Sequence, residues 1–84
     1  MKHVTIYIKT GCPYSHAAID LLNKKDIAFE QIDILGKKDL TEEMVKRANG
    51  RTSVPQIFIG ESHIGGCDDL YALEEKGELN KLLA

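Results

Sequence analysis

The sequence predicts a small α/β domain in which helices flank a four-stranded mixed sheet, in the order β-α-β-α-β-β-α. Runs rich in β-branched and aromatic residues alternate with segments of helical period. A helix between the first two strands predicts parallel pairing with a right-handed crossover. A short turn between the last two predicts a hairpin. With 84 residues in all, residues 1–84 are expected to form a single domain.

The first half of the chain predicts strand, helix and strand. Residues 3–9, HVTIYIK, form the first strand, which ends before Gly11. Pro13 suits a first helical turn, where a missing N–H costs nothing. A helix is therefore expected over residues 13–25, and residues 27–34, IAFEQIDI, form the second strand. The apolar spacing of the helix predicts a buried face made of Tyr14, Ala17, Ala18, Leu21 and Leu22.

The second half predicts a helix, a hairpin and a closing helix. Residues 40–48 form the helix, for which Asp39 and Glu42 resemble a capping box. Residues 56–59, QIFI, and 63–64 form the hairpin around a turn at 60–62. A helix then starts at residue 67, with carboxylates in its first turn, and stops at Gly77. A last helical turn, ELNKLLA, is expected to face Leu79, Leu82 and Leu83 inward.

Composition argues against several classes of partner. The formal net charge is −2, from 11 basic and 13 acidic side chains, so we expect neither nucleic acid nor acidic lipid to bind. No stretch approaches the roughly 20 apolar residues of a membrane span. The first apolar run is too short for a signal peptide, and we expect a cytoplasmic protein. Two cysteines are too few for a disulfide scaffold and are expected to be thiols.

Cys12 is the strongest candidate for chemistry. It stands where the first strand gives way to the first helix, at the positive end of that helix's dipole. Helix N-termini lower cysteine pKa values from about 8.5 to between about 3.5 and 7.5, which makes the thiol a nucleophile at neutral pH. Lys9 adds a positive charge three residues earlier. The alternative is a buried, inert cysteine.

Ser15 occupies the position where a second cysteine would complete a C-x-x-C pair. A hydroxyl cannot resolve a mixed disulfide, but it can donate a hydrogen bond to a thiolate. Alternatively, Ser15 is only a small polar residue in the first turn. In either case the chemistry is monothiol: a mixed disulfide on Cys12 has to be released by an outside thiol, of which glutathione is abundant in most cytosols.

Two later segments could complete a site around Cys12. The Val54–Pro55 bond is either a cis bond that presents the backbone of Val54 to an extended peptide, or a trans bond at a sheet edge. Asp68 is either a ligand contact or a helix N-cap, and these roles are compatible. Cys67 is either a second redox thiol or a half-buried residue of the helix cap. The three histidines, His3, His16 and His63, show no metal-ligand spacing, and no metal site is expected.

Three motifs together resemble the glutaredoxin family. CPYS after IYIKTG, then RTSVPQIFI, then HIGGCDDLYAL are similar to the active-site, TVP and GG-[CS]-D segments of glutaredoxins, in order across the whole chain. The chain is most similar to the small bacterial members. The resemblance implies a thioredoxin fold and a glutathione-dependent thiol–disulfide oxidoreductase. We expect it to act as a monomer on glutathionylated proteins or other disulfide substrates.

The resemblance also implies roles for single residues. Cys12 matches the nucleophile that carries the glutathionyl group, Tyr14 the tyrosine beside it, and Lys9 the basic residue that faces the glycine carboxylate. Either Arg47 or Arg51 could assist Lys9. Val54, before an expected cis Pro55, matches the position whose backbone pairs with the cysteinyl part of glutathione. The remaining matches hold the γ-glutamyl end or line the site, namely Gly66, Cys67, Asp68 and Thr52.

Position 15 departs from the family pattern C-P-Y-C. The serine removes the internal bridge needed for dithiol reduction of protein disulfides, and leaves the monothiol removal of glutathione. A change introduced for crystallisation or trapping would explain it equally. An alternative function is a dimer that bridges a [2Fe–2S] cluster through two Cys12 thiolates and two glutathione thiolates. A third is a structural or partner-binding role in which Cys12 is idle.

Overall fold

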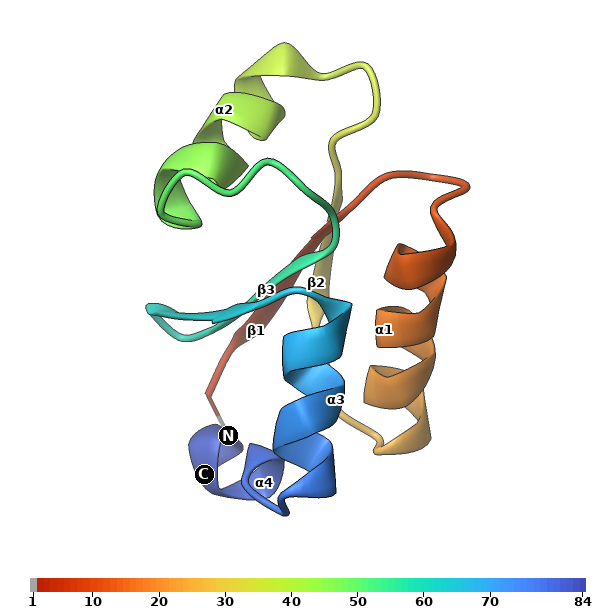
Figure 1. The fold of residues 1–84 in the computed structure, drawn as a ribbon, viewed down its shortest axis with the longest axis vertical. Helices are drawn as coiled ribbons and strands as arrows, with labels where there is room; N and C mark the ends of the chain where they lie inside the picture. The colour runs from red at the N-terminus through yellow and green to blue at the C-terminus, as the bar shows by residue number, and fades with distance from the viewer. Residues whose placement is uncertain (1) are drawn as a thin grey trace.

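The computed structural model describes residues 2–84. The described elements follow the predicted order, with the closing turn forming a fourth helix (Figure 1). The strands are β1 (Val4–Ile8), β2 (Glu30–Asp33), β3 (Gln56–Ile59) and β4 (Ser62–Gly65). The helices are α1 (Pro13–Lys24), α2 (Lys38–Arg47), α3 (Cys67–Glu75) and α4 (Leu79–Leu83).

The strands form one mixed sheet in the order β2-β1-β3-β4. β1 pairs with β2 in parallel and with β3 antiparallel, and β3 pairs with β4 antiparallel. Every residue of β1 and β3 is buried, because these strands occupy the centre and are covered on both faces. The predicted parallel pairing, crossover helix and hairpin are confirmed.

The two faces of the sheet bury different side chains. Alternation along β1 sends Val4, Ile6 and Ile8 toward α1 and α3, and Tyr7 toward α2. Figure 1 shows α1 and α3 side by side on one face and α2 across the other. Complete burial of an isoleucine such as Ile6 contributes about 1.5–3 kcal/mol relative to exposure. The larger of the two cores therefore anchors α1 and α3, whose N-termini lie at the same end of the helix pair.

The core under α2 contains a polar contact. The Tyr7 hydroxyl donates to Glu43 Oε2 at 2.6 Å and accepts from Arg47 Nη1 at 2.8 Å. Burial and the Glu43 carboxylate raise the pKa of Tyr7, while Arg47 opposes the shift. The Arg47 guanidinium also stacks 4.3 Å from the centre of the Phe58 ring. Arg47 therefore helps to hold α2 against the sheet through its contacts with Tyr7 and Phe58.

Several predicted element bounds need correction. The second strand covers only residues 30–33 of the predicted 27–34, because the Ile27 N–H instead bonds Leu22 O at the end of α1. α2 starts two residues earlier than predicted, with Lys37 as its N-cap and no side-chain cap, so Asp39 forms no capping box. Leu79 and Leu83 are buried as predicted, but Leu82 is exposed.

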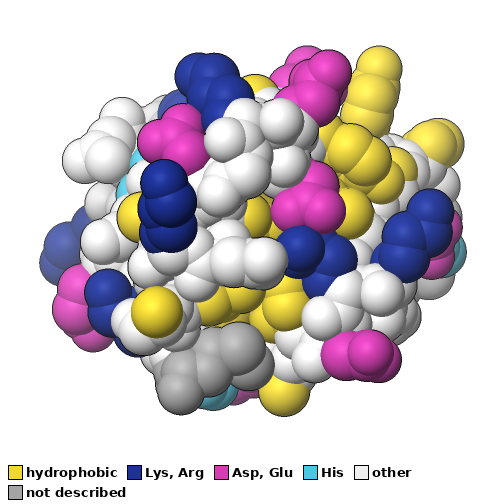
Figure 2. Space-filling model, turned by 90° about the horizontal axis from the view of Figure 1, so that it is seen from below, with side chains coloured by type: hydrophobic (Ala, Val, Ile, Leu, Met, Phe, Trp, Pro, Cys, Tyr) yellow, Lys and Arg dark blue, Asp and Glu magenta, His cyan; other side chains and the backbone are white. Residues whose placement is uncertain are grey.

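The buried face of α1 also differs from its prediction. Its buried residues are Ser15, Ala18, Leu21 and Leu22, while Tyr14 is 64% exposed. Pro13 starts the helix, and this places Ser15 on the inward side and Tyr14 outside. No helix among residues 2–84 combines the length and apolar character needed to span a bilayer. On the face that Figure 2 shows, side chains of both charge signs are interspersed with apolar ones.

Candidate functional site

Cys12 is the N-cap residue of α1. Its backbone is extended (φ −82°, ψ 118°), its N–H donates to Lys9 O at 3.1 Å, and its C=O accepts from His16 N at 3.1 Å. The thiol is half-exposed. The backbone N–H of Ser15 is the main cause that lowers the pKa of Cys12; partial burial opposes it, and the Ser15 hydroxyl, the Tyr14 N–H and the Lys9 charge assist. The helix N-terminus therefore stabilises the Cys12 thiolate mainly through the backbone N–H groups of its first turn.

Ser15 lies inside the protein. The residue is 1% exposed, and its Oγ makes no hydrogen bond of ordinary geometry. The hydroxyl is nevertheless close enough to Cys12 to help lower the pKa of the thiol. The hydrogen bond from this hydroxyl to the Cys12 sulfur, which the sequence suggested, is not formed in the structure. An unpaired buried hydroxyl costs about 1–3 kcal/mol.

A pocket opens beside the first turn of α1. Its wall is built from three segments: Tyr14 of α1, the loop before β3 with Arg51 and residues 53–55, and residues 66–69 at the start of α3. The Val54–Pro55 bond is cis, as the resemblance implies. Cys12 is not itself among the lining residues, but it is the N-cap of the helix whose first turn contributes Tyr14 to the wall. The first turns of α1 and α3 therefore border the same pocket.

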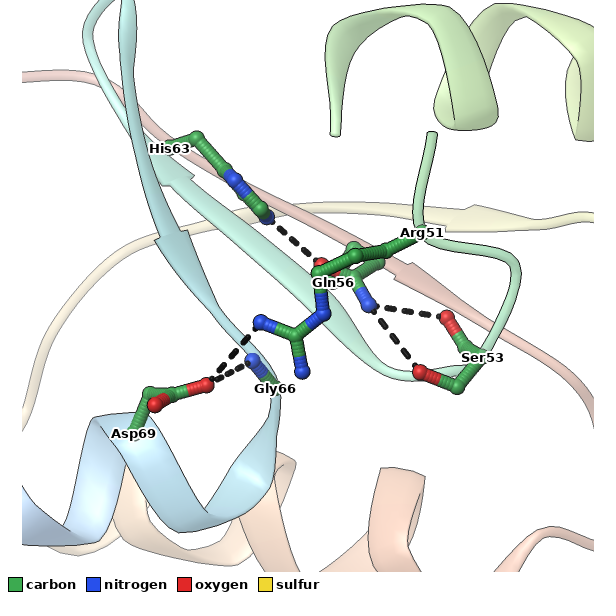
Figure 3. Close-up of polar contacts among 6 residues, drawn as sticks. All are labelled: Arg51, Ser53, Gln56, His63, Gly66 and Asp69. Carbon is green, nitrogen blue, oxygen red and sulfur yellow. Dashed lines mark hydrogen bonds and ion pairs between the residues drawn. The ribbon is translucent and has the colours of Figure 1, made fainter. Parts of the chain in front are cut away.

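Asp69 joins two walls of this pocket (Figure 3). Its Oδ2 accepts from the Gly66 N–H at 2.9 Å and lies 3.2 Å from Arg51 Nη1. The Gly66 N–H is the main cause that lowers the pKa of Asp69; Arg51 adds to it, and burial opposes it. Gly66 is the N-cap of α3 and Asp69 its third residue, so the carboxylate closes half of a capping box.

A family model matches the chain. The model is described as "Glutaredoxin" and covers residues 4–64. The chain belongs to the glutaredoxin family. Glutaredoxin 3 of Escherichia coli (strain K12) is 54% identical over 83 residues, which are 99% of each chain. A glutaredoxin of Pseudomonas aeruginosa is 49% identical over 84 residues, covering 100% of this chain and 99% of the relative.

Solved glutaredoxin structures share the fold. The solution structure of the Brucella melitensis glutaredoxin superposes with a TM-score of 0.86 at 51% identity, covering 99% of this chain and 89% of that one. A buckwheat glutaredoxin–glutathione complex superposes with a TM-score of 0.86 at 26% identity, covering 95% and 74%. The expected thioredoxin-like fold is confirmed. Glutaredoxins are glutathione-dependent thiol oxidoreductases, and this chain is one of the family.

Most residues matched to the glutaredoxin pattern meet at the pocket. Tyr14, Val54, Pro55 and residues 66–68 line it. Thr52 is exposed and lies outside the lining. Lys9 is exposed too and lines a separate groove with Lys37 and Lys38, although its charge still acts on Cys12. The structure thus collects the Val54 and Asp68 segments in one place and leaves Lys9 and Thr52 at the periphery.

The structure also distinguishes residues that the glutaredoxin resemblance left open. Arg51 lines the pocket against Asp69, whereas Arg47 is bound to Tyr7 on the other face of the sheet. Neither arginine lines the groove that contains Lys9. Asp69 and Ser53, which the sequence did not single out, line the pocket as well. The three-residue spacing of Gly66 and Asp69, with a glycine as the N-cap, is the signal that could have identified Asp69.

Cys67 and Asp68 are the first two residues of α3, and both line the pocket. Cys67 is 8% exposed, and burial is the main cause that raises the pKa of its thiol, so it is a weaker nucleophile than Cys12 at neutral pH. Asp68 is not the N-cap, because Gly66 holds that position and Asp68 is the second helical residue. Among residues 2–84, no three His, Cys, Asp or Glu side chains gather into a group that could hold a metal.

Proposed function

We propose that this glutaredoxin works by a monothiol mechanism, removing glutathione from glutathionylated proteins and small mixed disulfides. The observation that carries the proposal is the pair formed by positions 12 and 15. Cys12 is half-exposed with a lowered pKa at the end of α1, while position 15 holds a buried hydroxyl in place of a second thiol. A nucleophile is available, but an internal disulfide partner is lacking at position 15.

The reaction proceeds in two thiol–disulfide exchanges. The Cys12 thiolate attacks the glutathionyl sulfur of a mixed disulfide, which forms Cys12–S–S–glutathione and releases the substrate sulfur as a thiolate that takes up a proton. A second glutathione thiolate attacks the same glutathionyl sulfur, which forms oxidised glutathione and returns the Cys12 thiolate. One disulfide is reduced and one is formed, so electrons balance.

The pocket supplies groups for a bound glutathionyl tripeptide. The backbone of Val54 pairs with its cysteinyl part, and Tyr14 lies beside it. Free N–H groups at the start of α3, from Cys67 and Asp68, suit the γ-glutamyl carboxylate, and the Asp68 carboxylate suits its ammonium group. Lys9 attracts the glycine carboxylate from outside the pocket. Support comes from the lining of the pocket and from the glutathione complex of the buckwheat relative.

A coupled assay tests the proposal. Initial rates of deglutathionylation are measured while the concentrations of the glutathionylated peptide and of glutathione are both varied. Double-reciprocal plots of these rates should give the parallel lines of a ping-pong mechanism. Cys12→Ser should reduce the rate to background, whereas Asn80→Ser, an exposed change on α4, should not alter it. After incubation with oxidised glutathione, mass spectrometry should find one adduct, on Cys12. A Cys12→Ser variant with the wild-type rate would rule out the mechanism.

A second candidate function is a dimer that holds a [2Fe–2S] cluster. The half-exposed, low-pKa Cys12 favours it, because thiolates are the usual ligands of such clusters. A single chain offers only this one exposed thiolate, so the remaining ligands would come from a second copy and from two glutathione molecules. Anaerobic reconstitution with iron, sulfide and glutathione decides: visible absorbance that co-elutes with a dimer supports the cluster, and a colourless monomer excludes it.

A further inference from the structure

Gln56 is a polar side chain with no exposure to solvent, at the first position of β3. Its amide has partners on both sides (Figure 3). Nε2 donates to the Ser53 carbonyl at 3.0 Å and to Ser53 Oγ at 3.2 Å. Oε1 lies 2.6 Å from His63 Nε2. Such a fully paired, buried amide holds its partners in one arrangement.

The direction of these hydrogen bonds is fixed by chemistry. The Ser53 carbonyl can only accept, so the NH₂ group of Gln56 must face it and Oε1 must face His63. His63 Nε2 therefore carries a proton and donates. Its ring also packs 5.1 Å from the Phe58 ring, which holds the imidazole in place. The donors run in one direction, from His63 through Gln56 to Ser53.

Gln56 lies on the face of the sheet opposite α1 and α3. It pairs with Tyr7 and follows the same alternation as Phe58, and both of these side chains pack under α2. Gln56 and His63 do not line the pocket, whereas Ser53 and Val54 do. Any effect of Gln56 on a ligand must pass through the loop before β3.

The Ser53 carbonyl and the Val54 N–H belong to one peptide group. That group is trans, so its C=O and N–H point in opposite directions. Because Gln56 holds the carbonyl toward its own buried side chain, the Val54 N–H must point away from Gln56, and Ser53 and Val54 themselves line the pocket. Without Gln56 this peptide plane would be free to rotate.

We propose that Gln56 and His63 are positioning residues that fix the Ser53–Val54 peptide plane, so that the Val54 N–H is already oriented for an extended glutathionyl ligand. The proposal rests on the proposed function, in which the Val54 backbone pairs with the tripeptide. A pre-oriented N–H avoids the ordering cost that a mobile loop would add to binding. The effect belongs to recognition of the glutathionyl group and leaves the reactivity of the Cys12 sulfur unchanged.

Three variants and a control test the relay, by which we mean the hydrogen bonds that run from His63 through Gln56 to Ser53. Gln56→Met keeps the length of the side chain but cannot hydrogen-bond, His63→Leu removes the outer donor, and His63→Gln restores a donor of similar reach. Leu79→Ala, in the core at α4, lowers stability without touching the loop and controls for destabilisation. For each, we would measure kcat and KM with a glutathionylated peptide, the pH dependence of Cys12 alkylation, and the urea midpoint.

We expect Gln56→Met to raise KM for the glutathionylated peptide about tenfold, the size of one hydrogen bond, with kcat within about twofold. His63→Leu should raise KM less, and His63→Gln should return it toward wild type. Cys12 alkylation should keep its wild-type pH profile in all three. Leu79→Ala should lower the urea midpoint at unchanged KM.

The relay is overturned if Gln56→Met keeps the wild-type KM, or if Leu79→Ala raises KM as much. Should Gln56→Met fail to fold, the His63 pair decides: equal KM values for His63→Leu and His63→Gln reject the relay. Failure of the proposed function is read separately, from the Cys12→Ser variant. Loss of activity in Cys12→Ser with no KM change in Gln56→Met rejects the relay alone, whereas full activity in Cys12→Ser rejects both.

Discussion

Arg51 and Asp69 form an ion pair, with 3.2 Å between Nη1 and Oδ2, that ties the loop before β3 to the first turn of α3. The same carboxylate oxygen accepts from the Gly66 N–H. Both charged side chains are about half exposed, at 47% and 48%, so the pair alone contributes only about 0.2–1 kcal/mol. Its interest is its position, because it joins two segments that line the pocket.

Removal of the Asp69 carboxylate is predicted to weaken the fold modestly. Asp69→Ala deletes the capping contact and the partner of Arg51, and helix caps are worth about 1 kcal/mol. We expect Asp69→Ala to lower the free energy of unfolding by about 1–2 kcal/mol, and Asp69→Asn to lower it less because an amide oxygen still accepts from Gly66. Urea titrations at pH 7 measure both. Equal losses in the two variants would show that the charge, and not the cap, is what matters.

The contribution of Asp69 should vanish in acid. Its pKa is lowered in the folded protein, so its stabilisation is fully present above the unfolded value of about 3.9 and is lost as pH falls through the folded pKa. The difference in unfolding free energy between wild type and Asp69→Asn should therefore be constant near neutrality and shrink below about pH 4. A difference that is the same at pH 3 and pH 7 would contradict a charge-dependent role.

Cys12 should react as a thiolate below the pH at which free cysteine does. The N–H of Ser15 leads the groups that lower its pKa, so alkylation by iodoacetamide should show a midpoint below that of free cysteine measured in the same buffer. Lys9→Ala removes an assisting charge and should move that midpoint upward by a small amount, whereas Lys24→Ala, at the other end of α1, should not. A wild-type midpoint at or above that of free cysteine would revive the idle, structural role for Cys12.

The order of elements and the location of Cys12 could be predicted because local signals decide them. Strand propensity ends at Gly11, and Pro13 can only begin a helix, so a cysteine between them has to lie at the helix end. That Pro55 and the start of α3 lie near the N-terminus of α1 was implied by the family resemblance. The sequence carries no local signal for contacts between segments that are distant along the chain.

The roles of the acidic residues at the start of α3 could not be predicted in the same way. Two aspartates stand side by side at 68 and 69, and either could have been a cap. The choice depends on Gly66 adopting the extended N-cap backbone and on Arg51 arriving from another loop. The burial of Ser15 could not be predicted for a similar reason, because its inward direction follows from the exact residue at which the helix begins.

Ser15→Ala is predicted to separate stability from reactivity. The buried hydroxyl of Ser15 has no hydrogen bond, so its removal should leave stability unchanged or raise it by about 1 kcal/mol. The same hydroxyl helps to lower the pKa of Cys12, so its loss should move the alkylation midpoint upward. Urea unfolding and alkylation of the same variant give the two readings. A loss of stability would mean that the hydroxyl has a partner in solution.

Gly65→Ala should damage the pocket as well as the fold. Gly65 has φ +119°, a backbone region that side chains other than glycine rarely adopt, and a methyl group there would collide with the Asp69 carboxylate. The collision would drive Asp69 away from Gly66 and Arg51, so the wall at α3 would shift. We expect a loss of more than about 1 kcal/mol in unfolding free energy, together with a raised KM for a glutathionylated peptide.

Gly77→Ala provides the matched control, since φ is +72° there but a methyl group meets no atom within 4 Å. It should lower stability through backbone strain and leave KM unchanged, and an equal rise in KM for both variants would show that the collision with Asp69 does not shape the pocket.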